Sequence, residues 1–574
     1  MAEPVLSVTS NEGIVWNFAN GVQAGQYYTG DYWVKGPVVI SGVSPSPTFR
    51  ADGSQKHGSM LGSQLSESEQ GFDGIATFHI PYASSLNIAN YIGSPTPVVL
   101  SPGDRLISVS SGDTYPPIRV ASVLTCVSSE LSGDYLRPGY TDGSIDGYPV
   151  SSITPTIDRK LCKLDITDYL TKDLTTSAAV MSSVSSFWFD PYAGINAWII
   201  RPSNSMPVND TDLAATISNV ALALNTAAVN PLNTSSVALH LAQKGIDDYS
   251  NLVNLDNYWA GPGPQGAGKK FTILFAGHIL NHEGMKNIGY DYPVSSSPRF
   301  PEDAQTFIVA SAMDGEDVVV NDGYGNYALS DVGLPEWGQN HWVNPELDSS
   351  VWVDASSYGS DSRRFFSMKN WMGYIYAAKI MGLEGLWNHD PLFLYFNRYY
   401  AKEMEIRDEV VTENIKEALA PADFEWMYDY VSGFNSEYFA SSVAFGNVDG
   451  TQYHGIATKS NMLLYVSSYN PESNAVTLYL TNPIAALSSV MLIGGDLKGG
   501  ARFDDVSSVR YVDTSGFGGD EISERIISST LREYTINTTI APGKFYVQIL
   551  FIDESTNSIA ASSNVVLVDP EREY

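Results

Sequence analysis

Cysteine and basic residues are scarce in this 574-residue sequence, which has 2 Cys, and 32 Lys and Arg against 64 Asp and Glu. Cys126 and Cys162 could form one disulfide, but two cysteines exclude a fold held by a disulfide framework. The formal net charge of −32 leaves no basic stripe that could release counterions from a nucleic acid, so we expect no nucleic-acid partner. An acid excess of this size chiefly favours solubility.

Long apolar runs are also missing. None approaches the roughly 20 residues of a membrane-spanning helix, so we expect no membrane span. Residues 1–8 lack the basic start and the apolar core of a signal peptide. What is present is a hydrophobic fraction of 43% and an aromatic fraction of 12%, which suffice for well-packed cores. A chain of this length is expected to form about two to four domains.

The pattern along the chain predicts a multidomain α+β protein. Residues 1–125 contain short β-branched and aromatic runs broken by Gly, Pro, Ser and Asp, which predicts a β-sandwich-like domain. Residues 126–200 predict a linker and the entry to a helical domain over 201–435, where apolar residues recur at helical spacing. Residues 440–574 return to strands, and the last two are typical of an immunoglobulin- or fibronectin-like β-sandwich.

Capping and breaking residues mark the expected helices. Asp210 suits the cap of a helix with apolar positions up to Leu224, Pro301 suits a first helical position, and Gly382 ends a helix that includes Trp371. Further helices are expected over residues 235–252, 271–280, 410–419 and 421–431. Successive helices with polar loops are typical of a toroid built of helical hairpins.

Aromatic residues also gather in the N-terminal region, at Tyr27, Tyr28, Tyr32 and Trp33. Aromatic faces suit the apolar faces of sugar rings, so these four could form a sugar-stacking platform. A place in the β core or in a contact between subunits is the favoured interpretation.

Several motifs follow one another in an order that resembles a family of bacterial and phage proteins. They are Arg201–Pro207, Lys244–Tyr249, the glycine-rich loop into Lys269, Lys270 and Phe275–Gly277, Phe300–Gln305, Pro335–Gly338 with His341, and Trp387–Asp390 with Arg398 and Tyr399. The resemblance covers roughly residues 130 to 405. The helical core of that family is similar to the (α/α) toroid of polysaccharide lyases and some glycoside hydrolases. The resemblance therefore implies a toroid flanked by β domains.

The sequence departs from the family pattern at two places. Gln265 stands in the glycine-rich loop where a histidine is expected, and residues 367–370 lack a pair of cysteines. Both departures weigh against catalysis more than against the fold.

Two reactions suit a toroid that cuts polysaccharides. Elimination at a uronic acid needs a group that neutralises the carboxylate, a base and an acid, and Arg, Asn, His and Tyr can fill these roles. Hydrolysis needs two carboxyl groups that face each other across the scissile bond. The predicted catalytic residues are Glu336, His341, Glu302 and Asp303. The predicted substrate-binding residues are Asn204, Trp259, Lys269, Lys270, Trp337, Arg363, Arg364, Trp387, His389, Arg398 and Tyr399.

Glu336 and His341 give the sharpest signal, because they place a carboxylate and an imidazole in one polar loop. Glu302 and Asp303 are adjacent, so on a helix they point about 100° apart and are a poor working pair by themselves. Complementing the helix dipole is an equally good interpretation of these two acids. We expect the predicted residues that lie in loops to line a groove across the toroid.

No cofactor is expected. The glycine-rich loop has Gly261, Gly263, Gly266 and Gly268, but no clear strand precedes it and no Ser or Thr follows Lys270, so we reject a nucleotide site. The acidic loop over residues 314–322 leaves a structural Ca²⁺ open, although it lacks the ligand spacing of an EF-hand. No metal ligand is assigned.

These patterns favour a carbohydrate-engaging attachment protein, such as a phage tail component that binds its host, and they leave open whether its toroid depolymerises an acidic polysaccharide. The alternatives are a structural particle or surface-layer protein with an inactive toroid, and a secreted lyase or hydrolase whose signal was removed. The expected partner is a polysaccharide or surface glycan, with a homo-oligomer or other virion proteins left open. The expected location is extracellular or on a virion.

Overall fold

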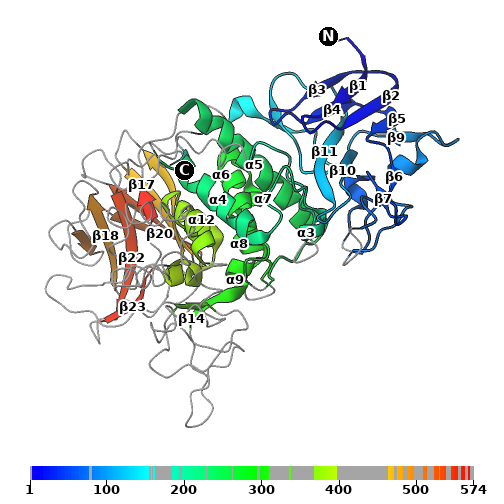
Figure 1. Ribbon diagram of the computed structural model, residues 1–574. Coiled ribbons are helices and arrows are strands. Elements are labelled where there is room, and N and C mark those ends of the chain that lie inside the picture. Colours follow the sequence, from blue (N-terminus) through cyan, green and yellow to red (C-terminus); the bar gives the residue numbers. More distant parts are fainter. Residues whose placement is uncertain are drawn as a thin grey trace, which may run out of the picture.

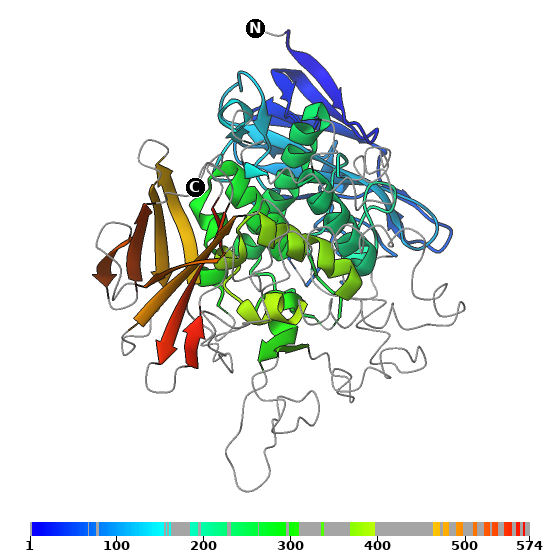
Figure 2. The ribbon, with the colours of Figure 1, turned by 90° about the vertical axis from the view of Figure 1, so that its left-hand side faces the viewer.

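The computed structural model describes two β-rich parts with a helical part between them (Figure 1). The described residues are 3–66, 68–75, 80–153, 157, 160–161, 184–192, 197–226, 231–261, 263–293, 298–308, 335–337 and 368–396, together with the strands between 463 and 568. Beyond residue 396 only the backbone of those strands is described. The view turned by 90° places the helices beside both β-rich parts (Figure 2).

Two sheets make up the N-terminal part. The first is antiparallel, in the order β1 (Val5–Thr9), β2 (Val15–Val22), β5 (Val38–Ser44) and β9 (Val98–Leu100). The second has the order β3 (Ala24–Gln26), β4 (Tyr32–Lys35), β11 (Ile118–Val127), β10 (Arg105–Ser111) and β8 (Ser59–Leu61). Only the β4–β11 pair of this second sheet is parallel. The prediction of a β-rich N-terminal region is therefore confirmed.

Short elements accompany these sheets. They are β6 (Thr48–Phe49), β7 (Gln55–Lys56), η1 (Gly62–Gln64), η2 (Ile88–Tyr91), β12 (Tyr135–Leu136), β13 (Tyr148–Pro149) and η3 (Val150–Ser152). β6 pairs with β7, and β12 pairs with β13, in both cases antiparallel. The β12–β13 hairpin leads the chain from the sheets towards the helices.

The two N-terminal sheets share one apolar core. Trp16 of β2 and Ile40 of β5 lie in the same buried cluster as Val34 of β4 and Leu124 of β11. Alternate residues of β2 point inward at its start, as a strand with one buried face requires. The indole Nε1 of Trp16 donates a hydrogen bond of 3.0 Å to Ser108 Oγ, so its polar atom is satisfied inside the core.

Tyr27 and Trp33 fill a core instead of offering a sugar platform. Both are buried, and they pack with Val127 at the end of β11. The hydroxyl of Tyr27 donates to the carbonyl of Asp146 at 2.7 Å. Cys126 is a free, buried thiol, and Cys162 lies outside the described residues.

The described α-helices of four or more residues fall between residues 197 and 396. The longer ones are α4 (Asp210–Leu224), α5 (Pro231–Asn254), α6 (Lys269–Leu280) and α12 (Met368–Ile380). The short ones are α3 (Ala197–Ile200), α7 (Glu283–Lys286), α8 (Ile288–Asp291), α9 (Pro301–Gln305) and α13 (Glu384–Trp387). A short strand, β14 (Thr306–Ile308), follows α9 and pairs antiparallel with β15 (Pro335–Trp337).

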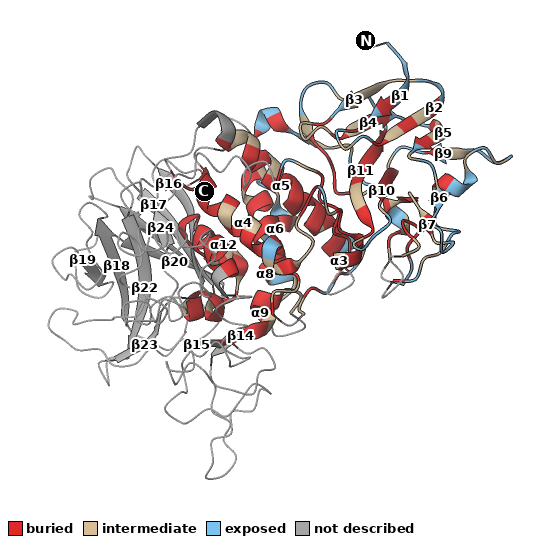
Figure 3. Ribbon diagram, viewed as in Figure 1, coloured by how far each residue is buried: buried red, intermediate tan, exposed pale blue. Residues whose placement is uncertain are grey.

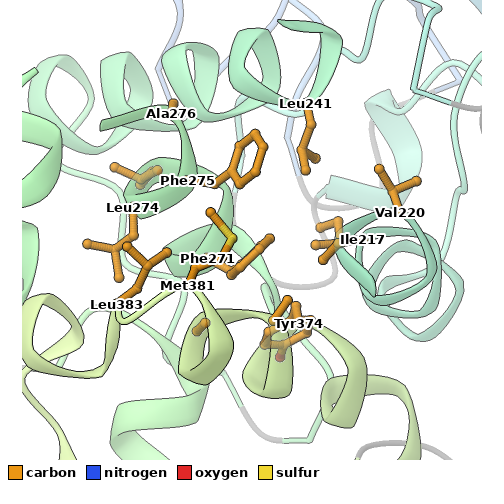
Figure 4. Close-up of a cluster of buried hydrophobic side chains, with 14 of the residues drawn as sticks. Ile217, Val220, Leu241, Phe271, Leu274, Phe275, Ala276, Tyr374, Met381 and Leu383 are labelled. Atoms are coloured by element: carbon orange, nitrogen blue, oxygen red, sulfur yellow. The ribbon is translucent and has the colours of Figure 1, made fainter. Parts of the chain in front are cut away.

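The longer helices enclose a common apolar core. Phe271 and Phe275 of α6 face side chains of α4, α5 and α12, such as Ile217, Leu241 and Tyr374 (Figure 4). Almost every described side chain of α6 and α12 is buried, so these two helices are apolar around most of their circumference (Figure 3). A helix of this kind must lie inside a larger body, which here is the helical part itself.

Local sequence signals explain several helix ends. Pro301 occupies the first position of α9, as predicted. Gly382 has a φ of +69° just beyond α12, where a left-handed glycine ends the helix as predicted. The expected cap Asp210 is wrong by one residue: Asn209 caps α4 by accepting the N–H of Asp212 at 2.8 Å. Asp210 instead accepts hydrogen bonds from Trp198 Nε1 and Arg201 Nη2, both at 2.7 Å.

The C-terminal strands form two antiparallel sheets. One has the order β16 (Leu463–Asn470), β17 (Ala475–Thr481), β21 (Leu531–Asn537) and β20 (Ile522–Ser528). The other has the order β19 (Val509–Asp513), β18 (Ser489–Asp496), β22 (Phe545–Asp553) and β23 (Ser558–Ser562), with β24 (Val566–Val568) also paired to β22. The expected strands near residues 462–466, 476–480, 533–536 and 545–551 are all present.

Two finer predictions about architecture stay predictions. The expected helices over residues 410–431 lie outside the described residues, so the closed toroid is untested. The immunoglobulin- or fibronectin-like topology of the C-terminal sheets is likewise untested. Among the helices that are described, none has the length and apolar character needed to cross a membrane.

Candidate functional site

The first turn of α9 lies against the start of α6. It carries two of the predicted catalytic acids, Glu302 and Asp303. α6 begins after Gly268, whose φ of +89° is left-handed and which has no side chain to cap the helix. Oε1 of Glu302 accepts the backbone N–H of Gly268 at 2.7 Å. A carboxyl from one helix therefore caps the positive end of another.

The two oxygens of Glu302 have different surroundings. Oε1 also accepts a hydrogen bond of 2.8 Å from the hydroxyl of Tyr374 on α12, whereas Oε2 is buried with no hydrogen-bond partner among the described residues. Burial raises the pKa of Glu302 to about 7, although the bonds from Gly268 and Tyr374 act in the opposite direction. A carboxyl that keeps its proton near neutral pH can donate a hydrogen bond or serve as a general acid.

Asp303, the neighbour of Glu302, forms a buried ion pair. Its Oδ2 is bound by the ammonium group of Lys270, and its Oδ1 accepts Nε1 of Trp387 at 2.9 Å. The same ammonium group lies 5.4 Å from the ring centres of Phe300 and Trp387, a cation–π distance. Leaving one member of such a pair alone in the interior costs about 3–5 kcal/mol. Asp303 and Lys270 therefore hold the scaffold together.

His389 lies just beyond the end of α13 and contacts Thr306, which follows α9. Its Nε2 lies 2.8 Å from Thr306 Oγ1 and 2.9 Å from the carbonyl oxygen of Thr306. Burial lowers the pKa of His389 to about 4, so the imidazole is neutral at physiological pH. Because the side chain is buried and bound to the start of β14, it fastens the α13 end to that strand.

Lys269 belongs to a second buried ion network. Its ammonium group lies 2.5 Å from Asp190 Oδ2 and 3.0 Å from Asp248 Oδ1. Arg201 binds the other side of Asp190 at 2.9 Å and reaches Asp210 at 2.7 Å. Burial favours a raised pKa at Asp190, but Arg201 and Lys269 outweigh it and hold that pKa below its usual value. The network ties α4, α5 and α6 to the segment around residue 190.

A small cavity opens beside this network. Its volume is about 10 Å³, which is room for about one water molecule. It is lined by Tyr140, Trp188, Asp190, Leu213, Ile217, Lys244, Asp247, Asp248 and Lys269. Within the described residues, the cavity is too small for a sugar ring, and no group of three or more metal-ligating side chains is found there or elsewhere.

Arg137 connects the N-terminal sheets to the helices. Its guanidinium group binds Asp31 at 3.0 Å, and it binds both oxygens of Asp247 on α5 at 2.8 and 2.7 Å. Its backbone N–H and C=O both bond to the side-chain amide of Gln243. Arg137 is fully buried. Burial by itself would lower the pKa of Arg137, but Asp247 and Asp31 raise it, so the charge is retained.

The structure brings together seven of the predicted site residues around α9 and α6. They are Glu302, Asp303, Lys269, Lys270, Trp259, Trp387 and His389, all of them buried. Trp259 lies under Lys269, whose ammonium group is 5.0 Å from its ring centre. The indoles of Trp259, Trp337 and Trp387 and the imidazole of His389 thus lie in the interior and not along an open groove. The substrate-binding role of these side chains stays a prediction.

The remaining predicted residues are placed elsewhere or lie outside the described residues. Glu336 and Trp337 lie on β15, where Glu336 pairs with Phe307 of β14, and only the backbone of Glu336 is described. Asn204 is exposed, and its N–H donates to the carbonyl of Arg119 in β11 at 2.9 Å. Outside the described residues are His341, Arg363, Arg364, Arg398, Tyr399 and the acidic loop over residues 314–322.

Several residues of this region were not predicted as site residues. Tyr374 packs in the core, with its ring stacked on that of Trp387 at a distance of 6.5 Å between ring centres. It also bonds Glu302, which an apolar helical pattern does not reveal. The acids Asp190, Asp247 and Asp248 were not predicted either. The sequence gives little signal for Asp247 and Asp248, because α5 carries other polar residues as well, and only the structure shows that both acids are buried.

Neither a family model, a curated protein nor a solved structure matches this chain. The toroid family of the sequence comparison is therefore still only a resemblance, and the chemistry of this chain rests on its own residues.

Proposed function

We propose that this chain is a carbohydrate-engaging attachment protein, of the kind carried by a virion such as a phage tail. In this proposal the helical part is an (α/α) toroid that acts as a rigid body, and the C-terminal sheets form an immunoglobulin- or fibronectin-like sandwich. The arrangement of β-rich, helical and β-rich parts supports a modular surface protein.

One observation carries the choice of attachment over depolymerisation. Asp303, a predicted catalytic acid, and Lys269 and Lys270, predicted substrate-binding residues, are all held in buried ion pairs. A catalytic carboxyl must reach the scissile bond, and a lysine that binds a uronic acid must be open to that ligand. The charged groups of these three side chains instead stabilise the fold through their ion pairs. The departure at Gln265 from the family pattern points the same way.

Depolymerisation of an acidic polysaccharide is the second candidate, and Glu302 favours it. This carboxyl has a pKa of about 7 and one oxygen with no hydrogen-bond partner among the described residues. Those are properties of a general acid that works near neutral pH. Against it stand the burial of Glu302 and the net charge of −32, since a polyanion is repelled by an acidic chain.

A panel of neutral, amino and uronic polysaccharides separates the two candidates. Affinity electrophoresis of the full chain measures binding, while absorbance at 232 nm and new reducing ends measure elimination and hydrolysis. Retention without either product supports attachment. Product formation that is abolished in a Glu336→Gln, His341→Ala double variant supports the depolymerase with the predicted residues. Absence of retention on every polysaccharide refutes the proposed carbohydrate function.

A further inference from the structure

Three aromatic side chains meet at the surface of the helical part, near the end of α6 that is opposite Glu302 and Asp303. His282, just before α7, lies between Tyr148 of β13 and Tyr249 of α5. Its ring centre is 6.0 Å from that of Tyr148 and 5.6 Å from that of Tyr249, and both pairs are edge-to-face. All three side chains are partly exposed. They are referred to below as the aromatic cluster.

The position of Tyr249 depends on a glycine. A Cβ atom at Gly284 would collide with the Tyr249 hydroxyl and would lie 3.2 Å from Cε1 of His282. Gly284 lies inside α7, where glycine is less favourable than alanine by about 1 kcal/mol. The absence of a side chain there leaves room for the phenol of Tyr249 beside the imidazole.

Packing against the core and a hydrogen bond fix the positions of the rings in the cluster. Tyr148 and Tyr249 pack against the apolar core of the helices. Nδ1 of His282 accepts the backbone N–H of Met285 at 3.2 Å and so caps α7. Rings held in this way lose little conformational entropy when a ligand stacks on them.

The charges near the cluster are mostly negative. Asp142 acts electrostatically on all three rings, Asp291 acts on Tyr249, and Glu283 acts on His282. Lys286 is a cation that acts on His282, and it is paired with Glu283 at 2.7 Å. A uronic acid or a sulfated sugar would be repelled by this surface. A neutral or cationic sugar would not be, and carboxylates are good acceptors for its hydroxyl or amino groups.

We propose that the aromatic cluster of Tyr148, Tyr249 and His282 is a binding site for a sugar ring that carries no negative charge, such as a neutral hexose or an amino sugar. This inference rests on the proposed carbohydrate function and narrows its ligand class. The apolar face of the sugar stacks on the partly exposed rings, and its polar groups bond Asp142 and the two phenol hydroxyls. The rings are uncharged at neutral pH, because burial lowers the pKa of His282 and raises those of Tyr148 and Tyr249.

The test uses the full chain, with laminarin as the neutral probe, chitosan as the cationic probe and alginate as the anionic probe. His282→Asn is the main variant, because Asn removes the ring and keeps a side chain suited to capping α7. Tyr148→Ala removes a second ring. Phe49→Ala is the matched control, since Phe49 lies on β6 in the N-terminal part and is an aromatic residue with 69% exposure.

We expect laminarin or chitosan to be bound and alginate not to be bound. His282→Asn and Tyr148→Ala should each weaken that binding about tenfold, the loss that corresponds to one aromatic contact, while Phe49→Ala leaves it unchanged. Circular dichroism confirms that each variant is folded. Binding to any of the probes that both cluster variants leave unchanged overturns this inference but not the carbohydrate function, and so does binding to alginate alone. Absence of binding to all three probes overturns the inference, and the wider polysaccharide panel then decides the carbohydrate function.

Discussion

Replacing Glu302 by Gln isolates the energetic consequence of burying this carboxyl. The amide keeps an acceptor oxygen for the N–H of Gly268 and the hydroxyl of Tyr374, which Oε1 of Glu302 now accepts at 2.7 and 2.8 Å. It places a neutral NH₂ group where Oε2 lies without a partner among the described residues. The variant therefore preserves the shape and the cap of α6 while removing the titration.

The sign of the effect follows from the direction of the pKa change. The folded chain holds the Glu302 proton more tightly than the unfolded chain does, because burial raises the pKa from the ordinary 4.5 to about 7. The contribution of this group to the free energy of unfolding is fully present below pH 4.5 and is lost as the pH rises towards 7. A pKa difference of this size corresponds to about 3 kcal/mol. Glu302→Gln removes this loss of stability with rising pH, because the amide does not titrate.

The assay is urea unfolding followed by tryptophan fluorescence at pH 4.5, 6 and 8. Tryptophan reports on this region because Trp259, Trp371 and Trp387 are buried there. Relative to the wild type, the variant should gain about 3 kcal/mol of stability between pH 4.5 and pH 8. Glu283→Gln, which changes an exposed acid at the first turn of α7, should follow the wild-type pH profile. If the stability of Glu302→Gln depends on pH in the same way as that of the wild type, the pKa of Glu302 is not raised in the folded chain and the reasoning fails.

Three further substitutions test other contacts of the helical part. Arg137→Met should destabilise the chain by about 3–5 kcal/mol in urea unfolding, because it leaves two buried carboxylates without their cation, and a loss below about 1 kcal/mol would contradict this. Lys270→Met should cost about as much, and adding Asp303→Asn should restore most of it; additive losses in the double-mutant cycle would show that the two side chains are not coupled. Gly284→Ala should lower the melting temperature because its Cβ meets the Tyr249 hydroxyl, and Tyr249→Phe in the same chain should relieve part of the loss. If Tyr249→Phe raises the melting temperature of Gly284→Ala no more than it raises that of the wild type, the close contact is refuted.

Elements were predictable from the sequence where a local pattern decides them. The helix start at Pro301 and the helix end near Gly382 follow from the stereochemistry of single residues. The C-terminal strands follow from runs of β-branched and aromatic residues. The cap of α4 was placed one residue late because Asn209 and Asp210 are both good caps, and only the tertiary pull of Arg201 on Asp210 decides between them.

The candidate site was less predictable, because its bonds join residues far apart in the chain. Lys269 and Lys270 were expected to bind substrate because lysine side chains can bind an acidic sugar. On a helix, however, neighbours point about 100° apart, so each lysine meets a different carboxylate. Lys269 finds Asp190 and Asp248, whereas Lys270 finds Asp303. The spacing of these residues in the sequence does not show which carboxylate each lysine meets, because only the packing of α6 against α5 and α9 creates the pairs.

The burial of Arg137 has a mechanical consequence. A joint between two domains usually bends first when tension is applied across it. Here the joint contains a guanidinium group held by Asp31 on the side of the sheets and by both oxygens of Asp247 on the side of the helices. Because the side chains of Arg137, Asp31 and Asp247 are all buried, water cannot replace their hydrogen bonds until the joint has already opened. The N-terminal sheets and α5 should therefore move together as one rigid unit. Force applied to the sheets should be transmitted to the helices without bending at this joint.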